Sequence, residues 1–233
     1  MNLIVFGKTP TLSIDIKWSA DRGILLSSRE NRIVPEVDPG VSVTWEYLLQ
    51  KSTPEILDLE AWKDRDAERL LKEVTRILGK EFTESAEEVF FTRYVEYCLR
   101  CSSDPMRELA LIPQVWLNWI HYDPGAQPEP LGLPREPFRV DFVIMSEWRK
   151  IVMEIDGESH FLEFFGIDSA GKVSAKPQID RYSAHLKKDR WLRREGWEVW
   201  RFTSKEVMTE ADFFSFDLEM GFPFGFGAPT EEA

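Results

Sequence analysis

The spacing of apolar side chains divides the first third of the chain into short strand-like runs and one helix-like segment. Runs with strand composition lie at residues 3–6, 12–18 and 41–45, and the second of them alternates between apolar and polar positions. Residues 55–79 instead carry apolar side chains at helical spacing and end at Gly79. We therefore expect small strands followed by a helix in this region, which contains no recognisable chemical motif.

Two further helices are predicted in the rest of the chain. The first begins at Ser85, where the pattern S-x-x-E places Glu88 in the position of a capping box, and it continues to Leu99. The second helix is expected over residues 179–195, and Gly196 ends it.

Apolar runs around these helices predict the remaining strands. They lie at residues 109–120, 139–144, 150–156 and 197–202. Segments rich in polar residues, glycine and proline at 123–137 and 162–178 are expected to be loops. The C-terminal tail, rich in Phe, Gly and Pro, is not expected to form a regular element.

The order of these elements predicts the fold class. The short link between residues 144 and 150 favours an antiparallel strand pair, whereas a helix between the last two strands favours a parallel pair. The chain is therefore expected to be α/β, with a mixed central β-sheet flanked by helices and an N-terminal β/α appendage. The expected units are an accessory region at 1–80, a core at 81–210 and a tail at 211–233.

Candidate chemistry is concentrated in the strand pair at 139–156. Asp141 lies in the first strand, and Glu154 and Asp156 lie in the second, where a spacing of two puts both side chains on one face. Carboxylates in apolar strands are costly to bury unless a cation compensates their charge. Three of them meeting at one end of a hairpin would form an oxygen-rich site suited to Mg²⁺ or Mn²⁺.

Composition and charge narrow the picture further. Of the 233 residues, 43% are apolar, which is enough for a packed core and argues against disorder. The net charge of −12 argues against a sequence-independent DNA clamp. The charge is uneven, however, because bases are concentrated at 187–205 whereas 206–233 carry acids and no base. A local basic surface is therefore compatible with an acidic chain.

The cysteines and the hydropathy bear on the cellular setting. Cys98 and Cys101 are the only cysteines, and without a second pair we expect buried thiols in a helix rather than a zinc or redox site. The sequence shows no signal peptide and no long uncharged apolar run, so a cytoplasmic protein that does not enter a membrane is expected.

Several pieces of the chain resemble the restriction-endonuclease-like, PD-(D/E)XK nuclease superfamily, and most closely its branch around very-short-patch-repair endonucleases. The matching pieces follow one another with suitable gaps within residues 81–210. They are Ser85-x-x-Glu88, Ile112-Pro-Gln114, Arg139-Val-Asp-Phe142, Glu154-Ile-Asp-Gly-x-x-His160, Asp189-Arg-x-Leu-x-x-x-Gly196, Val199-x-Arg-Phe202 and Glu206-Val207. Residues 1–80 lie outside the resemblance.

The resemblance implies an endonuclease that hydrolyses phosphodiester bonds with Mg²⁺ or Mn²⁺, with DNA favoured over RNA as its partner. Asp141 and Glu154 match the metal ligands of the superfamily, and Glu88 matches the first-helix acid that completes the metal site. Gln114 and His160 would contact the attacking water, the metal or the scissile phosphate.

Asp156, also a candidate catalytic residue, stands where the superfamily motif usually has lysine. In relatives the lysine can move to the following helix, where Lys188 is preferred as the catalytic base over its neighbour. The same helix carries the candidate nucleic-acid-binding residues Lys187, Arg190 and Arg194.

Simpler interpretations of individual residues stay open. The capping box alone explains Glu88, and a hydrogen bond to a loop at the strand end explains His160. Arg201, inside a strand, could pair with an acid at the edge of the core.

Two other classes of function are also open. The first is a nuclease-like module without activity that binds nucleic acid or a protein partner, which the missing motif lysine and the acidic charge favour. The second is an assembly or regulatory protein in which residues 1–80 and the aromatic tail do the work, with residues 1–80 mediating a homodimer or contacting a protein partner.

Overall fold

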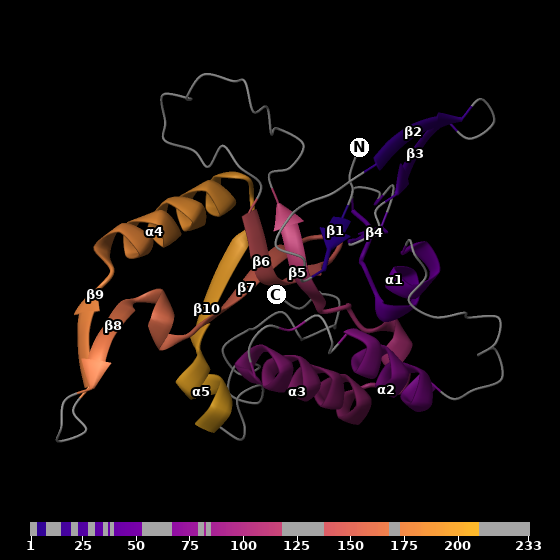
Figure 1. The fold of residues 1–233 in the computed structure, drawn as a ribbon. Coiled ribbons are helices and arrows are strands. Elements are labelled where there is room, and N and C mark those ends of the chain that lie inside the picture. Colours follow the sequence, from indigo (N-terminus) through magenta and orange to yellow (C-terminus); the bar gives the residue numbers. More distant parts are fainter. Residues whose placement is uncertain are drawn as a thin grey trace, which may run out of the picture.

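The centre of the fold is a six-stranded mixed sheet. In the computed structural model, residues 4–7, 15–19, 23–27, 31–34, 37, 40–52, 67–78, 82, 85–117, 138–167 and 173–209 are described. The strands of the sheet are β1 (Ile4–Phe6), β4 (Arg32–Val34), β5 (Ile112–Leu117), β6 (Phe138–Met145), β7 (Lys150–Asp156) and β10 (Glu198–Thr203). Their spatial order is β10-β7-β6-β5-β1-β4 (Figure 1).

The two strand pairings predicted from connection lengths are confirmed, and with them the α/β class with a mixed sheet. β6 and β7 pair antiparallel, and their register sets Phe142 opposite Met153. β7 and β10 pair parallel, joined through α4 (Ile179–Arg194). Gly196 ends this helix as expected, with φ +80° and a hydrogen bond of 3.1 Å from its N–H to the carbonyl of Arg193.

The sheet continues into the N-terminal region that was expected to be an appendage. β1 pairs antiparallel with β5, setting Val5 opposite Trp116 and Phe6 opposite Val115, and β4 pairs with β1 on its other side. β1 therefore covers the edge of β5 that would otherwise expose unpaired backbone groups. Strands β2 (Asp15–Ser19) and β3 (Gly23–Ser27) form a separate two-stranded sheet.

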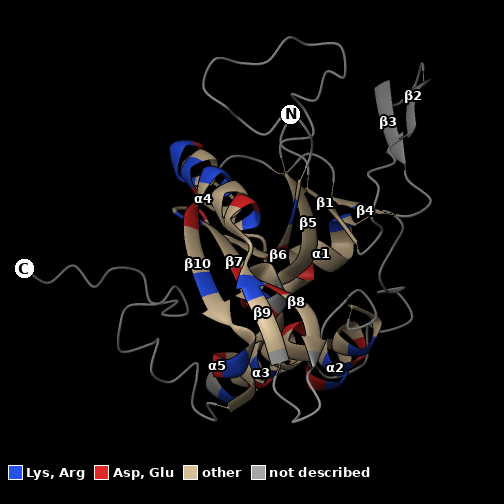
Figure 2. Ribbon diagram, turned by 60° about the vertical axis from the view of Figure 1, so that its left-hand side comes forward, with Lys and Arg blue, Asp and Glu red and all other residues tan. Residues whose placement is uncertain are grey.

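Helices cover both faces of the central sheet. α4 lies on one side, and α3 (Ser85–Cys101), α2 (Ala67–Leu78) and α5 (Ser204–Thr209) lie on the other (Figures 1 and 2). On the second side, the ring of Phe90 packs against Phe142 and Phe202 at centroid distances of 5.3 and 5.4 Å. Because side chains alternate along a strand, Asp141 and Arg201 face the side of α4.

The strand expected at 41–45 is wrong. Helix α1 (Trp45–Lys51) begins there, because the Thr44 hydroxyl accepts a hydrogen bond of 3.1 Å from the N–H of Tyr47 and caps the first turn. Trp45 and Leu48 are buried in the core, so the β-branched run before Thr44 only leads into the helix.

The loop expected at 162–178 is also wrong in its described part. Residues Leu162–Ile167 (β8) and Val173–Pro177 (β9) pair as an antiparallel hairpin with a bulge between Phe164 and Gly166. Most of its side chains for which exposure is described lie partly or fully in solvent, Phe164 and Phe165 included. A strand pair without a buried face has no apolar alternation that could be recognised.

Several other expectations fall partly outside the described residues. The helix expected at 55–79 is confirmed over α2, and its first part, the loop at 123–137 and the tail at 211–233 lie outside. Cys98 is buried in α3 as expected, whereas the Cys101 side chain is outside the described part. Within the described segments, no helix combines the length and apolar character needed to cross a membrane.

Candidate functional site

The candidate site is built on two carboxylates that β6 and β7 bring side by side. The antiparallel register that sets Phe142 opposite Met153 places Asp141 beside Glu154, on the face opposite the one that α3 covers. Glu154 is buried, with 5% of its surface exposed. Two acids are thus held together within an apolar sheet, as the sequence pattern predicts.

The Asp141 carboxylate is held in one orientation, and its surroundings disfavour its charged form. Its Oδ2 accepts a hydrogen bond of 2.7 Å from the N–H of Ile155. Burial raises the pKa of Asp141 well above its ordinary value, and the neighbouring carboxylates of Glu154 and Glu87 raise it further. The hydrogen bond from Ile155 and the charge of Lys188 lower the pKa but do not compensate. The site therefore contains a carboxyl group whose charged form its own cation does not fully stabilise.

Lys188 supplies that cation from the face of α4 that meets the sheet. Its Nζ donates a hydrogen bond of 2.5 Å to Oε1 of Glu154 and a second, of 2.9 Å, to the carbonyl of Arg139. The neighbouring Lys187 is exposed. Lys188, which the sequence favoured as the lysine supplied by this helix, is thus the one that contacts Glu154.

Gln114 enters the site through an irregularity in β5. Residues Pro113 and Val115 pair with Phe142 and Val140, so Gln114 stands opposite Asp141, yet its φ of +53° breaks the ladder there. The left-handed region is unfavourable for residues other than glycine and is often found at functional sites. Its carbonyl accepts a hydrogen bond of 3.0 Å from the N–H of Gly7.

Gln114 is 1% exposed, and only one of the two polar atoms of its side-chain amide forms a hydrogen bond among the described residues. Nε2 donates a hydrogen bond of 3.0 Å to Oε2 of Glu87, whereas Oε1 is buried and accepts no hydrogen bond from the residues that the structure describes. A buried amide oxygen without a partner is costly and is the kind of donor that a cation can satisfy.

The first-helix acid of the site is Glu87 and not Glu88. Glu88 is exposed, whereas Glu87 is buried, contacts Gln114 and raises the pKa of Asp141. The signal was present in the sequence, because Glu87 continues the buried stripe of Phe91 and Tyr94 at a spacing of four and then three residues. The neighbouring capping-box pattern obscured it.

Asp156 was expected to join these carboxylates, but it belongs to a separate ion-pair network. Nη1 of Arg201 donates to its two oxygens at 2.9 and 2.8 Å, and the same guanidinium donates to Asp189 on α4. Arg201 thus pairs with acids at the edge of the core, which was the simpler interpretation of its position. Asp189 contributes to this network although it was not predicted as a site residue.

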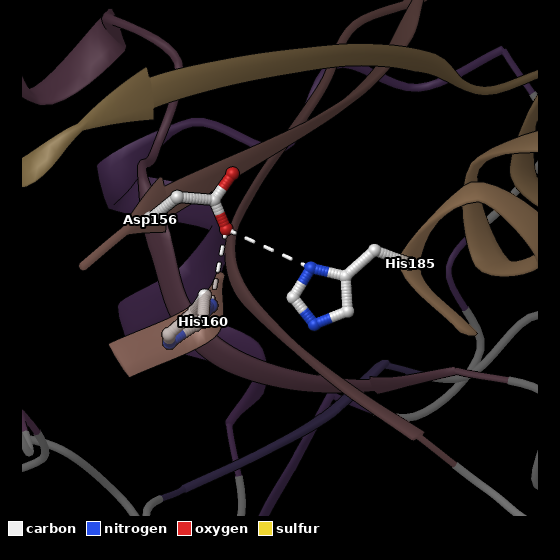
Figure 3. Close-up of side chains that lie close together, drawn as sticks. All are labelled: Asp156, His160 and His185. Atoms are coloured by element: carbon white, nitrogen blue, oxygen red, sulfur yellow. Dashed lines mark hydrogen bonds and ion pairs between the residues drawn. The ribbon is translucent and has the colours of Figure 1, made fainter. Parts of the chain in front are cut away.

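Two histidines adjoin Asp156. His160, in the 3₁₀ turn Glu158–His160, has its Nδ1 3.1 Å from Oδ1 of Asp156, and His185 on α4 has its Nδ1 4.0 Å from the same oxygen (Figure 3). Burial alone would raise the pKa of Asp156, but hydrogen bonds from His160 and Arg201 outweigh it and lower the pKa. His160 thus meets Asp156 rather than the Asp141 pair, and His185 was not predicted.

The candidate nucleic-acid-binding residues lie on the outer surface of α4. Lys187, Arg190 and Arg194 are exposed, and Arg194 also forms an ion pair of 3.0 Å with Glu195. Lys and Arg positions recur along α4 in Figure 2. The helix therefore presents one lysine to the carboxylates and several bases to solvent.

No family model, curated protein or solved structure matches this chain. The function is therefore inferred from the site itself.

Proposed function

We propose that this protein is a metal-dependent nuclease that hydrolyses phosphodiester bonds, with DNA as the favoured substrate. The observation that carries the proposal is the surplus of buried negative charge around Asp141. The charged groups with the largest influence on Asp141 are the carboxylates of Glu154 and Glu87, which raise its pKa, and the ammonium of Lys188, which lowers it. The guanidinium of Arg201 also interacts with Glu154. Buried carboxylates whose repulsion Lys188 does not offset favour binding of a divalent cation.

The donor set fits a hard cation. Asp141 and Glu154 offer carboxylate oxygens, and Oε1 of Gln114 is a buried neutral oxygen without a hydrogen-bond donor in the described segments. Mg²⁺ and Mn²⁺ prefer oxygen ligands of this kind. Asp141, Glu154 and Gln114 are the residues that would hold the ion, with Glu87 orienting the Gln114 amide.

The chain supplies the rest of the chemistry from fixed positions. A bound divalent cation would polarise water and neutralise charge on the phosphate. Lys188 keeps a positive charge beside Glu154, where it can stabilise the charge that develops on a phosphoryl group. The N–H of Ile155 holds the Asp141 carboxylate in one orientation. Exposed bases on α4 can contact the nucleic-acid backbone next to the site.

A second candidate function is a nuclease-like module that binds without cleaving. It is favoured by Asp156, which replaces the usual motif lysine and is itself paired with Arg201. The net charge of −12 points the same way.

Cleavage of plasmid and single-stranded DNA with Mg²⁺ or Mn²⁺ tests the proposal. Asp141→Ala and Glu154→Ala should abolish cleavage, and Glu87→Ala should reduce it strongly. Glu88→Ala, one residue away on the exposed side of α3, is the matched control and should leave the rate unchanged. Binding without cleavage by the wild type in Mn²⁺ would support the second function, and cleavage that survives Asp141→Ala would exclude the proposed site.

A further inference from the structure

Three potential metal ligands converge outside the Asp141 site, and they come from three different elements. Asp156 ends β7, His160 lies in the 3₁₀ turn that follows, and His185 lies on α4. Figure 3 shows both imidazole rings beside the same carboxylate oxygen of Asp156. One ligating atom from each residue lies within 4.8 Å of the other two.

The spacing of these atoms is close to that of a metal site. A tetrahedral ion with bonds of about 2.0–2.1 Å to nitrogen and oxygen separates its ligands by about 3.3 Å. The two measured separations from Oδ1 of Asp156 are 3.1 Å to Nδ1 of His160 and 4.0 Å to Nδ1 of His185. Small side-chain rotations would therefore bring all three atoms around one ion.

His185 is the observation that points to a ligand. Its Nδ1 is buried and has no hydrogen-bond partner among the described residues, which is costly for a polar atom. A neutral ring keeps the lone pair that a metal requires.

Arg201 does not neutralise the site completely, although it contacts Asp156. Its guanidinium is shared with Asp189, so the two carboxylates and the one guanidinium together carry a net charge of −1. Each carboxylate oxygen has two lone pairs, so Oδ1 can accept from Arg201 and still bind an ion. Carboxylates that bind metals are commonly held in this way by a second hydrogen-bond partner.

We infer that Asp156, His160 and His185 form a second metal site, distinct from the Asp141 site, for a divalent transition ion such as Zn²⁺. Two imidazole nitrogens and one carboxylate oxygen suit Zn²⁺ or Co²⁺ and are a poor match for Mg²⁺, which takes oxygen ligands. Three protein ligands leave one tetrahedral position for water. Because Glu154 and Asp156 are two residues apart on β7, the two sites lie roughly 7 Å apart along the strand.

A Co²⁺ titration in saturating Mg²⁺ tests the inference without relying on activity. Mg²⁺ occupies oxygen-only sites, and Co²⁺ bound to imidazole in a tetrahedral site gives visible absorption. The wild type should bind one Co²⁺, and excess Zn²⁺ should displace it. His160→Ala and His185→Ala should each weaken binding by more than about 100-fold, since even loss of an outer partner of a metal ligand costs 10- to 100-fold.

Two controls separate this site from the proposed nuclease site. His121→Ala changes the third histidine of the chain, which lies outside the described residues, and should leave Co²⁺ binding intact. Asp141→Ala should also leave it intact, even where cleavage is lost. If His185→Ala does not fold, His160→Ala gives the same readout from a more exposed position. Unchanged binding in both histidine variants, or loss of binding in Asp141→Ala, would overturn the inference.

Discussion

Lys188 on α4 and Glu154 on β7 are joined by a hydrogen bond of 2.5 Å between Nζ and Oε1. The contact links α4 to β7 across 34 residues of sequence. It also places a positive charge beside the pair formed by Asp141 and Glu154. Lys188 therefore both stabilises the site and supplies it with a fixed cation.

Replacing Lys188 by Met should slow cleavage by about 100- to 1,000-fold, the usual effect of removing one group that stabilises charge in the transition state. The substitution removes the charge beside Glu154 but keeps a side chain of similar length. Single-turnover cleavage of a labelled DNA duplex at saturating Mn²⁺ measures the effect on the chemical step.

Lys187→Met is the matched control for this variant. Lys187 is adjacent on the same helix but exposed, so its loss should alter the salt dependence of binding and leave the single-turnover rate within a few-fold of the wild type. Equal rate losses in the two variants would show that α4 acts through its overall charge and not through the contact with Glu154.

Asp141→Asn should stabilise the metal-free protein at neutral pH. The folded-state pKa of Asp141 is raised, chiefly by burial, so the ionised group costs stability once the pH exceeds its unfolded value of about 4. Asparagine removes the charge and keeps an oxygen for the Ile155 N–H. The melting temperature should rise by about 2–4 °C for each kcal/mol gained.

The stability gained by Asp141→Asn should depend on pH. Well below the unfolded pKa of about 4, Asp141 is protonated in both states, so the part of the stability difference that arises from its charge should vanish there. Mn²⁺ should stabilise the wild type at pH 7 and have little effect on Asp141→Asn. A variant less stable than the wild type in chelator at pH 7 would contradict the charge surplus.

Gln114→Gly and Gln114→Val distinguish the contribution of the backbone conformation of this residue from the contribution of its side chain. Glycine adopts φ +53° without strain, so Gln114→Gly should fold as the wild type does but lose cleavage with the amide. Valine is strongly disfavoured at this φ and should destabilise the protein by roughly 1–3 kcal/mol. Urea unfolding and cleavage, measured on both, distinguish the two effects. Full activity in Gln114→Gly would show that the Gln114 side chain is not part of the nuclease site.

The part of the fold that could be predicted depends on local signals. Apolar runs interrupted by Asp141 and Glu154, together with the short link between them, were enough to predict strands β6 and β7 and their antiparallel pairing. The pairing of β1 with β5 joins residues far apart in sequence and has no local signal. Thr44 marked a helix start that the β-branched residues before it concealed.

The candidate site shows the same division. Lys188 could be predicted because the resemblance placed a lysine on that helix. Glu87 could have been predicted from its place in the stripe that contains Phe91, but the positive φ of Gln114 has no sequence signal. The ion pair between Asp156 and Arg201 depends on the parallel register of β7 and β10, which sets Arg201 opposite Glu154. Only the assembled sheet provides that geometry.

Arg201→Met should destabilise the protein by roughly 3 kcal/mol, because it leaves two buried carboxylates without their shared cation. The side chains of Arg201, Asp156 and Asp189 are 23%, 4% and 12% exposed, so solvent cannot replace the guanidinium fully. Urea unfolding in chelator, at pH 7, measures the loss.

Arg149→Met is the matched control, because Arg149 also forms a two-pronged ion pair, with Glu198 across the same strand pair. These two side chains are 34% and 40% exposed, and an exposed pair contributes at most about 1 kcal/mol. The two losses should therefore differ clearly although each substitution removes one arginine. If they are equal, burial of Asp156 and Asp189 does not set the strength of the network, and Arg201 acts as an ordinary surface ion pair.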